Sequence, residues 1–183
     1  MVAVAPGGRI TRERYWQLVG EGVIDPDERI ELLEGVIVAM VPQNPPHAFT
    51  TTTLTRLLSA ALGPGATLRV QLPFDIGEFS TPEPDFAVVE PIRYTKAHPD
   101  RAFLIIEVAD SSLKIDRDEK LELYARAGVP EYWIVNLGEG TIGRHSEPAH
   151  GAYGRLTTFR RGETVQILAF PDVAVRVDEV FGE

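Results

Sequence analysis

The chain has 183 residues, a formal net charge of −9, a sequence pI near 5.0 and a mean hydropathy of −0.06. These values are typical of a globular protein large enough to bury a core, and we expect a single domain over residues 1–183. Because the chain has no cysteine, disulfides, thiolate metal sites and a cysteine nucleophile are excluded. The first ten residues lack the features of a signal peptide, and no apolar run approaches a membrane span, so we expect a cytoplasmic protein.

The first half of the chain predicts four segments, which are separated by glycine- and proline-containing loops. In order they are a flexible lead (1–10), a helix with Thr11 as its N-cap (11–22), a hairpin that turns at Glu34-Gly35 (29–41) and a helix with leucines on one face (47–63).

The second half predicts short strands rich in Val, Ile and Phe, as expected for a sheet buried on both faces. In order the predicted segments are a strand broken by Pro73 (66–76), two buried strands (85–90 and 102–109), a helix from an N-cap at Asp116 to about Ala127, a third buried strand (131–136), and a C-terminal meander of weaker strands that ends in a short helix.

Three charged residues stand at the edges of these buried segments. Asp85 opens one strand, Glu107 lies near the end of the next, and Lys120 follows on the predicted helix. Two carboxylates and an ammonium on neighbouring elements can support Mg²⁺-dependent cleavage of a phosphodiester, because Mg²⁺ needs few protein ligands and keeps water positions open. The alternative is that each residue is a solvated strand end or a member of an ordinary ion pair.

Strand alternation places Glu107 on the same face as Phe103, Ile105 and Ala109. An ionised carboxylate on an apolar face is costly unless a partner compensates its charge. The pattern therefore predicts either a paired glutamate or one that emerges into water.

The sequence resembles a large bacterial family of putative restriction endonucleases, formerly a domain of unknown function, within the PD-(D/E)XK nuclease superfamily. The similarity lies in the stretches 82–85, 105–112 and 116–136, with weaker likeness at 30–35 and at Pro46-His47. The resemblance implies an α+β or α/β restriction-endonuclease-like core, with a mixed sheet flanked by helices, an N-terminal helix and hairpin, and a C-terminal β-meander.

The same resemblance implies that Asp85 and Glu107 are metal ligands. In the superfamily pattern the lysine lies two residues after the glutamate, where this chain has Ala109. The resemblance suggests that Lys120 has taken over this role from the first turn of the following helix, because its long side chain can bridge the remaining gap.

Further residues are candidates for the same site. Glu31 and the backbone carbonyl of Val108 are candidate metal ligands, and His47 is a candidate proton carrier or phosphate contact. Gln71 is a candidate for the wall of the cleft. The apolar neighbours of Tyr124, Tyr132 and Trp133 favour packing in the core over stacking on bases.

Two functional hypotheses follow from these residues. The first is an endonuclease that uses Mg²⁺ or Mn²⁺ to cleave nucleic acid, DNA rather than RNA, as a homo-oligomer, with a dimer as the expected assembly. The net charge of −9 counts against a nucleic-acid partner. The second hypothesis is therefore a catalytically inactive protein with the nuclease fold, which acts as an oligomeric binding module. A zinc hydrolase lacks support, because the chain has four histidines and none at i,i+4 spacing.

Overall fold

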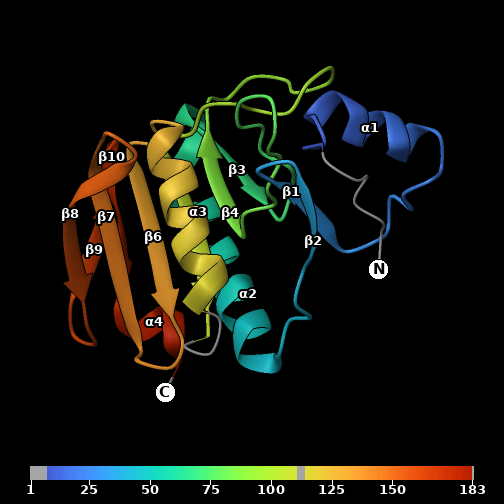
Figure 1. Cartoon of the computed structure of the whole chain (residues 1–183). Coiled ribbons are helices and arrows are strands. Elements are labelled where there is room, and N and C mark those ends of the chain that lie inside the picture. Colours follow the sequence, from blue (N-terminus) through green and yellow to red (C-terminus); the bar gives the residue numbers. More distant parts are fainter. Residues whose placement is uncertain (1–7, 111–113, 183) are drawn as a thin grey trace.

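The centre of the structure, a computed structural model that describes residues 8–110 and 114–182, is a mixed six-stranded sheet. Its strands lie in the order β3-β4-β5-β6-β7-β8 (Figure 1). Their bounds are β3 Thr67–Val70, β4 Phe86–Val89, β5 Leu104–Ala109, β6 Glu131–Asn136, β7 Thr141–Ala149 and β8 Ala152–Phe159. Only the β5–β6 pair of this sheet is parallel. A parallel pair needs a crossover connection, and α3 (Lys114–Arg126) supplies it. The predicted mixed α+β core is confirmed.

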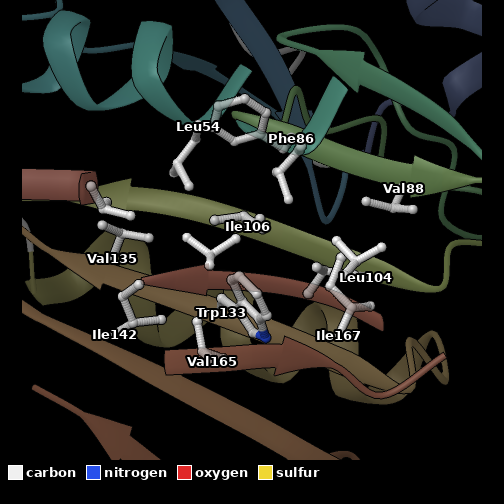
Figure 2. Close-up of a cluster of buried hydrophobic side chains, with 14 of the residues drawn as sticks. Leu54, Phe86, Val88, Leu104, Ile106, Trp133, Val135, Ile142, Val165 and Ile167 are labelled. Carbon is white, nitrogen blue, oxygen red and sulfur yellow. The ribbon is translucent and has the colours of Figure 1, made fainter. Parts of the chain in front are cut away.

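One face of the sheet is covered by α2 (Pro45–Leu62), α4 (Val177–Phe181) and the separate antiparallel pair β9 (Thr164–Ile167) and β10 (Phe170–Arg176). Figure 2 shows the apolar side chains between these layers. Leu54 of α2, Ile106 of β5 and Trp133 of β6 are fully buried there. Complete burial of such side chains stabilises the fold by about 1.5–3 kcal/mol each.

The opposite face is covered by α3 (Figure 1). Ile105 of β5, Tyr132 of β6 and Tyr124 of α3 are fully buried in a second apolar cluster. Successive residues of β5 therefore point to different clusters, as strand alternation predicts. Phe103 is an exception, because it precedes the strand and packs on the α2 face with Phe170. The prediction that Phe103 shares a face with Glu107 is wrong.

A helix and a hairpin lie beside the sheet: α1 (Arg12–Gly20), β1 (Ile30–Leu33) and β2 (Val36–Ala39). Thr11 caps α1, as predicted, and accepts a hydrogen bond from the Arg14 N–H at 3.2 Å. The hairpin turns at Glu34 and Gly35, whose φ angles of 50° and 81° suit a tight two-residue turn.

Most of the predicted flexible lead, residues 1–7, lies outside the described residues. Its last part does not behave as predicted. The Ile10 N–H donates to the Gly35 carbonyl at 2.9 Å, and the Arg9 guanidinium bonds Glu34 at 2.6 Å. This segment is therefore tied to the hairpin turn, where a Cβ on Gly35 would lie 2.5 Å from the Cβ of Arg9.

Three boundaries differ from the predictions. Helix α2 begins at Pro45 because Asn44 caps it and proline suits the first helical position. Helix α3 begins at Lys114, so Asp116 lies inside it and is not its N-cap. Strand β3 ends at Val70, because Gln71 has a φ of 50°, outside the extended range.

The C-terminal strands are longer than the predicted weak meander. Strands β7 and β8 form a hairpin that extends the central sheet, while β9 and β10 pair with each other. The predicted short C-terminal helix is confirmed as α4. A short 3-10 turn, η1 (Gly63–Gly65), follows α2. None of the described helices is long and apolar enough to cross a membrane.

Candidate active site

A half-open pocket with a volume of about 240 Å³ lies where β4 begins and β5 ends. The hairpin, the segment that leads to α2, and α3 form its other walls. It contains most of the site residues predicted from the sequence. These are Glu31, His47, Asp85, Glu107, Val108 and Lys120.

Asp85 is held at the edge of the pocket by three donors. Its Oδ1 accepts a hydrogen bond from Gln71 Nε2 at 3.0 Å, and its Oδ2 accepts one from the Val108 N–H at 2.8 Å. The same Oδ2 lies 3.2 Å from His47 Nε2. A carboxylate has about four lone-pair positions, so these contacts orient Asp85 and leave room for another ligand.

The pair of Asp85 and His47 is electrostatically coupled. Burial works to raise the pKa of Asp85, but the hydrogen bond and charge of His47, together with Val108 and Gln71, outweigh burial and lower it. Burial opposes the charged form of His47, yet contact with Asp85 raises the pKa of the imidazole. Thr51 Oγ1 lies 3.3 Å from His47 Nδ1 and so helps to orient the ring. The ion-paired form of the two side chains is therefore favoured.

Glu107 is a partly buried carboxylate of the same pocket, and it meets two donors from α3. Its Oε1 accepts from Lys120 Nζ at 3.3 Å and from the Tyr124 hydroxyl at 3.1 Å. Lys120 Nζ also lies 3.0 Å from Glu31 Oε1, so the ammonium bridges two carboxylates. Lys120 is the seventh residue of α3, so it lies on the second helical turn and not on the first.

The charges in this group shift each other's pKa. Burial raises the pKa of Glu107 to about 7, with further increases from Asp85 and Glu31, and Lys120 only partly offsets them. The pKa of Lys120 is raised, because the charges of Glu107 and Glu31 outweigh the effect of burial. The lysine is therefore cationic near neutral pH, while Glu107 titrates there.

Sequence reasoning missed two contributors to the site. Tyr124 was assigned to the core, and its ring is indeed buried, but its hydroxyl contacts Glu107. Its position four residues after Lys120, on the same helical face, is a signal that could have found it. Glu83 also lines the pocket, its N–H donates to Glu31 Oε2 at 3.1 Å, and burial raises the pKa of its own carboxyl group.

Other sequence candidates have different outcomes. Gln71 does not line the pocket, but its side-chain amide donates a hydrogen bond to Asp85. Ala109, where the superfamily pattern has its lysine, does line the pocket. Val108 contacts Asp85 through its N–H, and the role of its carbonyl as a metal ligand stays a prediction. Both oxygens of Glu31 are engaged by Lys120 and Glu83, so its predicted role as a metal ligand also stays untested.

The donors of the pocket suit a hard divalent cation. The described residues contain no preformed cluster of three or more His, Asp and Glu ligands. Mg²⁺ often takes only one or two protein carboxylates and completes its shell with water and phosphate oxygens. Asp85 is fixed by N–H donors, and no hydrogen bond within the described residues occupies Glu107 Oε2. These two carboxylates therefore fit such an ion, with the open pocket available to water.

The chain is similar to known proteins in sequence and in fold. The model of the Uma2 family, described as "Putative restriction endonuclease", matches residues 12–178. The chain is also similar to a solved structure titled as a putative nuclease belonging to DUF820 from Anabaena variabilis, with a TM-score of 0.73 at 17% identity. That match covers 94% of this chain and 97% of the other, and it shows a common fold. Curated proteins give no match. The chain belongs to the Uma2 family of putative restriction endonucleases.

Proposed function

We propose that the chain is an endonuclease that hydrolyses phosphodiester bonds in DNA, with Mg²⁺ or Mn²⁺ bound by Asp85 and Glu107. The observation that carries the proposal is the convergence of both carboxylates and Lys120 in one pocket, with the ammonium 3.3 Å from Glu107. Family membership supports a nuclease function, and families of this kind usually use divalent metals.

When bound, the divalent cation supplies an activated water and a polarised phosphate oxygen. In this proposal Asp85 and Glu107 hold the ion, with the Val108 carbonyl as a further ligand. Lys120 orients the nucleophile and offsets the negative charge that develops on the phosphate. Glu31, at 3.0 Å, keeps the lysine ammonium beside the reacting groups. His47 serves as the proton carrier.

The electrostatics of Glu107 support a cation-dependent site. With a pKa of about 7, this carboxyl group binds a proton over part of the neutral range. A divalent cation favours the ionised form and so competes with that proton. Metal affinity should therefore rise with pH as Glu107 ionises.

Cleavage of plasmid and single-stranded DNA tests the proposal. Purified protein with Mg²⁺ or Mn²⁺ is expected to cut these substrates, and Asp85→Ala is expected to abolish cutting because a metal ligand is lost. Asp172→Ala removes an exposed carboxylate on β10 and is the matched control. Cleavage that survives in Asp85→Ala contradicts the proposed site.

A non-catalytic binding module is the second candidate. The net charge of −9 and the absence of a lysine at Ala109 favour it. It predicts no cleavage with any divalent metal, a stable assembly in sedimentation experiments, and an unchanged fold in Lys120→Ala. For either function we propose a dimer in the cytoplasm.

A further inference from the structure

A group of basic and aromatic side chains lies outside the active-site pocket, along the edge strand β3. Arg69 projects from β3, Arg12 and Trp16 from α1, and Tyr94 and His98 from the loop between β4 and β5. None of these five residues lines the active-site pocket. We call them the basic–aromatic cluster.

The arginines of this cluster are poorly compensated. The Arg69 Nε is buried and has no hydrogen-bond partner within the described residues. Its guanidinium makes two long hydrogen bonds within the described residues, 3.4 Å to the Pro73 carbonyl and 3.5 Å to His98 Nδ1. Arg12 Nη1 forms a long ion pair with Asp75 Oδ2, at 3.6 Å. A guanidinium presents five N–H donors, so both arginines can donate to further acceptors such as phosphate oxygens.

Burial adds to this imbalance. It lowers the pKa of Arg69, which means that the surroundings oppose its charge more than Tyr94 and Asp75 favour it. An added anion would relieve that cost. Phosphate is a suitable anion, because its oxygens match the planar fork of a guanidinium.

The rim of the cluster has the same character. Arg93, Lys96 and Arg101 are exposed on the β4–β5 loop, which also carries Glu90 and Asp100. Together with Asp75, the segments α1, β3 and the β4–β5 loop hold six basic and four acidic residues, whereas the whole chain has 18 basic and 27 acidic residues. The local excess of positive charge therefore runs against the net charge of the molecule.

Aromatic rings alternate with these cations. The Trp16 ring lies 5.0 Å from the His98 ring at an interplanar angle of 33°, and Tyr94 lies 5.5 Å from the Arg69 guanidinium. Cations beside aromatic side chains are typical of surfaces that follow a nucleic-acid backbone, where phosphates meet arginine and bases meet rings.

We propose that the basic–aromatic cluster binds backbone phosphates of the nucleic-acid substrate, at a distance from the bond that is cut. This inference rests on the proposed function for its choice of partner. It explains how a chain of net charge −9 can hold a polyanion: an anchoring surface for the strand is separate from the acidic pocket.

Binding is measured by fluorescence anisotropy with labelled single-stranded and duplex DNA of about 20 nucleotides in Ca²⁺, over about 50–200 mM KCl. The double variant Arg12→Gln/Arg69→Gln is expected to bind about tenfold more weakly, with a salt slope shallower by about one to two units, because phosphate contacts are lost. Arg155→Gln removes an exposed arginine from β8, at the other edge of the sheet, and is expected to bind like the wild type.

A second variant keeps the test decisive if loss of Arg69 impairs folding. Arg93→Gln/Lys96→Gln changes only exposed side chains and is expected to weaken binding about threefold. Wild-type affinity and salt slope in both double variants overturn the inference, as does equal weakening by Arg155→Gln. Failure of the wild type to bind either DNA also overturns it.

Hydrolysis of a small phosphodiester distinguishes failure of this inference from failure of the proposed function. Bis(p-nitrophenyl) phosphate has a single phosphate and cannot occupy both sites at once, so its Mn²⁺-dependent hydrolysis should be equal in the wild type and the cluster variants. Hydrolysis with unchanged DNA binding in the cluster variants leaves the nuclease standing and removes the anchor. Weakened DNA binding without any hydrolysis leaves the anchor standing and removes the nuclease.

Discussion

The two faces of the central sheet bury different kinds of side chain, although the same strands supply both. Under α2, the cluster around Leu54, Ile106 and Trp133 is apolar, and the one buried carboxylate beside it in the described structure, Glu131, accepts hydrogen bonds from Trp133 Nε1 and the Leu168 N–H. Under α3, the apolar cluster ends at Glu107, which is compensated by Lys120 and Tyr124. Neighbouring residues of β5 therefore have different roles. Strand alternation separates the residues that pack in the core under α2 from the carboxylate that belongs to the site.

This difference has a thermodynamic consequence. Burial of apolar side chains does not depend on protonation, so the packing around Leu54 on the α2 face should contribute the same stability across the neutral range. The α3 face should depend on pH and on divalent cations, because Glu107 and its partners change charge there. The following substitutions test that division.

Leu54→Ala should cause the largest loss of stability. Leu54 is fully buried on the α2 face, so the variant leaves a cavity and should lose about 4 kcal/mol in the free energy of unfolding. Denaturant unfolding at about pH 5 and pH 8 should give the same loss at both values. A loss that changes strongly between them would show that the two faces are not independent.

Lys120→Met should rank second, with a loss of about 3–4 kcal/mol at about pH 8, because Glu31 and Glu107 are left without their shared cation. The loss should shrink towards about pH 5, where Glu107 is protonated. Lys96→Met, at an exposed position, is the control for removing a lysine. Equal losses at both pH values would contradict the assigned coupling.

Glu107→Gln should stabilise the protein in the absence of metal. The pKa of Glu107 is raised from 4.5 to about 7 in the folded state, so the folded wild type binds the proton more tightly than the unfolded chain. The resulting stability is complete below about pH 4.5 and is lost as pH rises towards 7, by about 3 kcal/mol in total. The variant lacks this dependence, so its advantage in unfolding free energy should grow over that window. A constant difference would show that Glu107 has an ordinary pKa.

Tyr124→Phe should have the smallest effect, a loss of about 1.5 kcal/mol, because one hydrogen bond to Glu107 is removed and the ring still fills its site. DNA cleavage should fall while the Mn²⁺-induced increase in melting temperature persists. Tyr153→Phe, whose hydroxyl bonds the Val129 carbonyl, is the matched control and should retain full cleavage.

Much of the sheet could be predicted from the sequence, because its central strands are short, β-branched and buried on both faces. The alternation in β5 also placed Glu107 on the same face as Ile105 and Ala109, and it predicted either a paired glutamate or one that emerges into water. The partner could not be identified in the same way. The contact between Glu107 and Tyr124 depends on how α3 crosses the sheet. Apolar neighbours in the sequence do not indicate that the hydroxyl of a tyrosine contacts a carboxylate.

The edges of the molecule were harder to predict. Strands β7 and β8 are partly exposed and contain glycines, so their pattern predicted a weak meander and gave no sign that they extend the central sheet. Arg9 and Ile10 are predicted to belong to a flexible lead, but in the structure they contact a hairpin turn about 25 residues away. Contacts of this kind leave no periodic signal in the sequence.

The central claim is that Asp85 and Glu107 together bind a divalent cation. Calorimetric titration of the wild type, Asp85→Ala, Glu107→Gln and the Asp172→Ala control with Mn²⁺ tests it most directly. We predict that the wild type and the control bind Mn²⁺ with equal affinity, and that both site variants lose this binding. Wild-type affinity in either Asp85→Ala or Glu107→Gln would contradict the account.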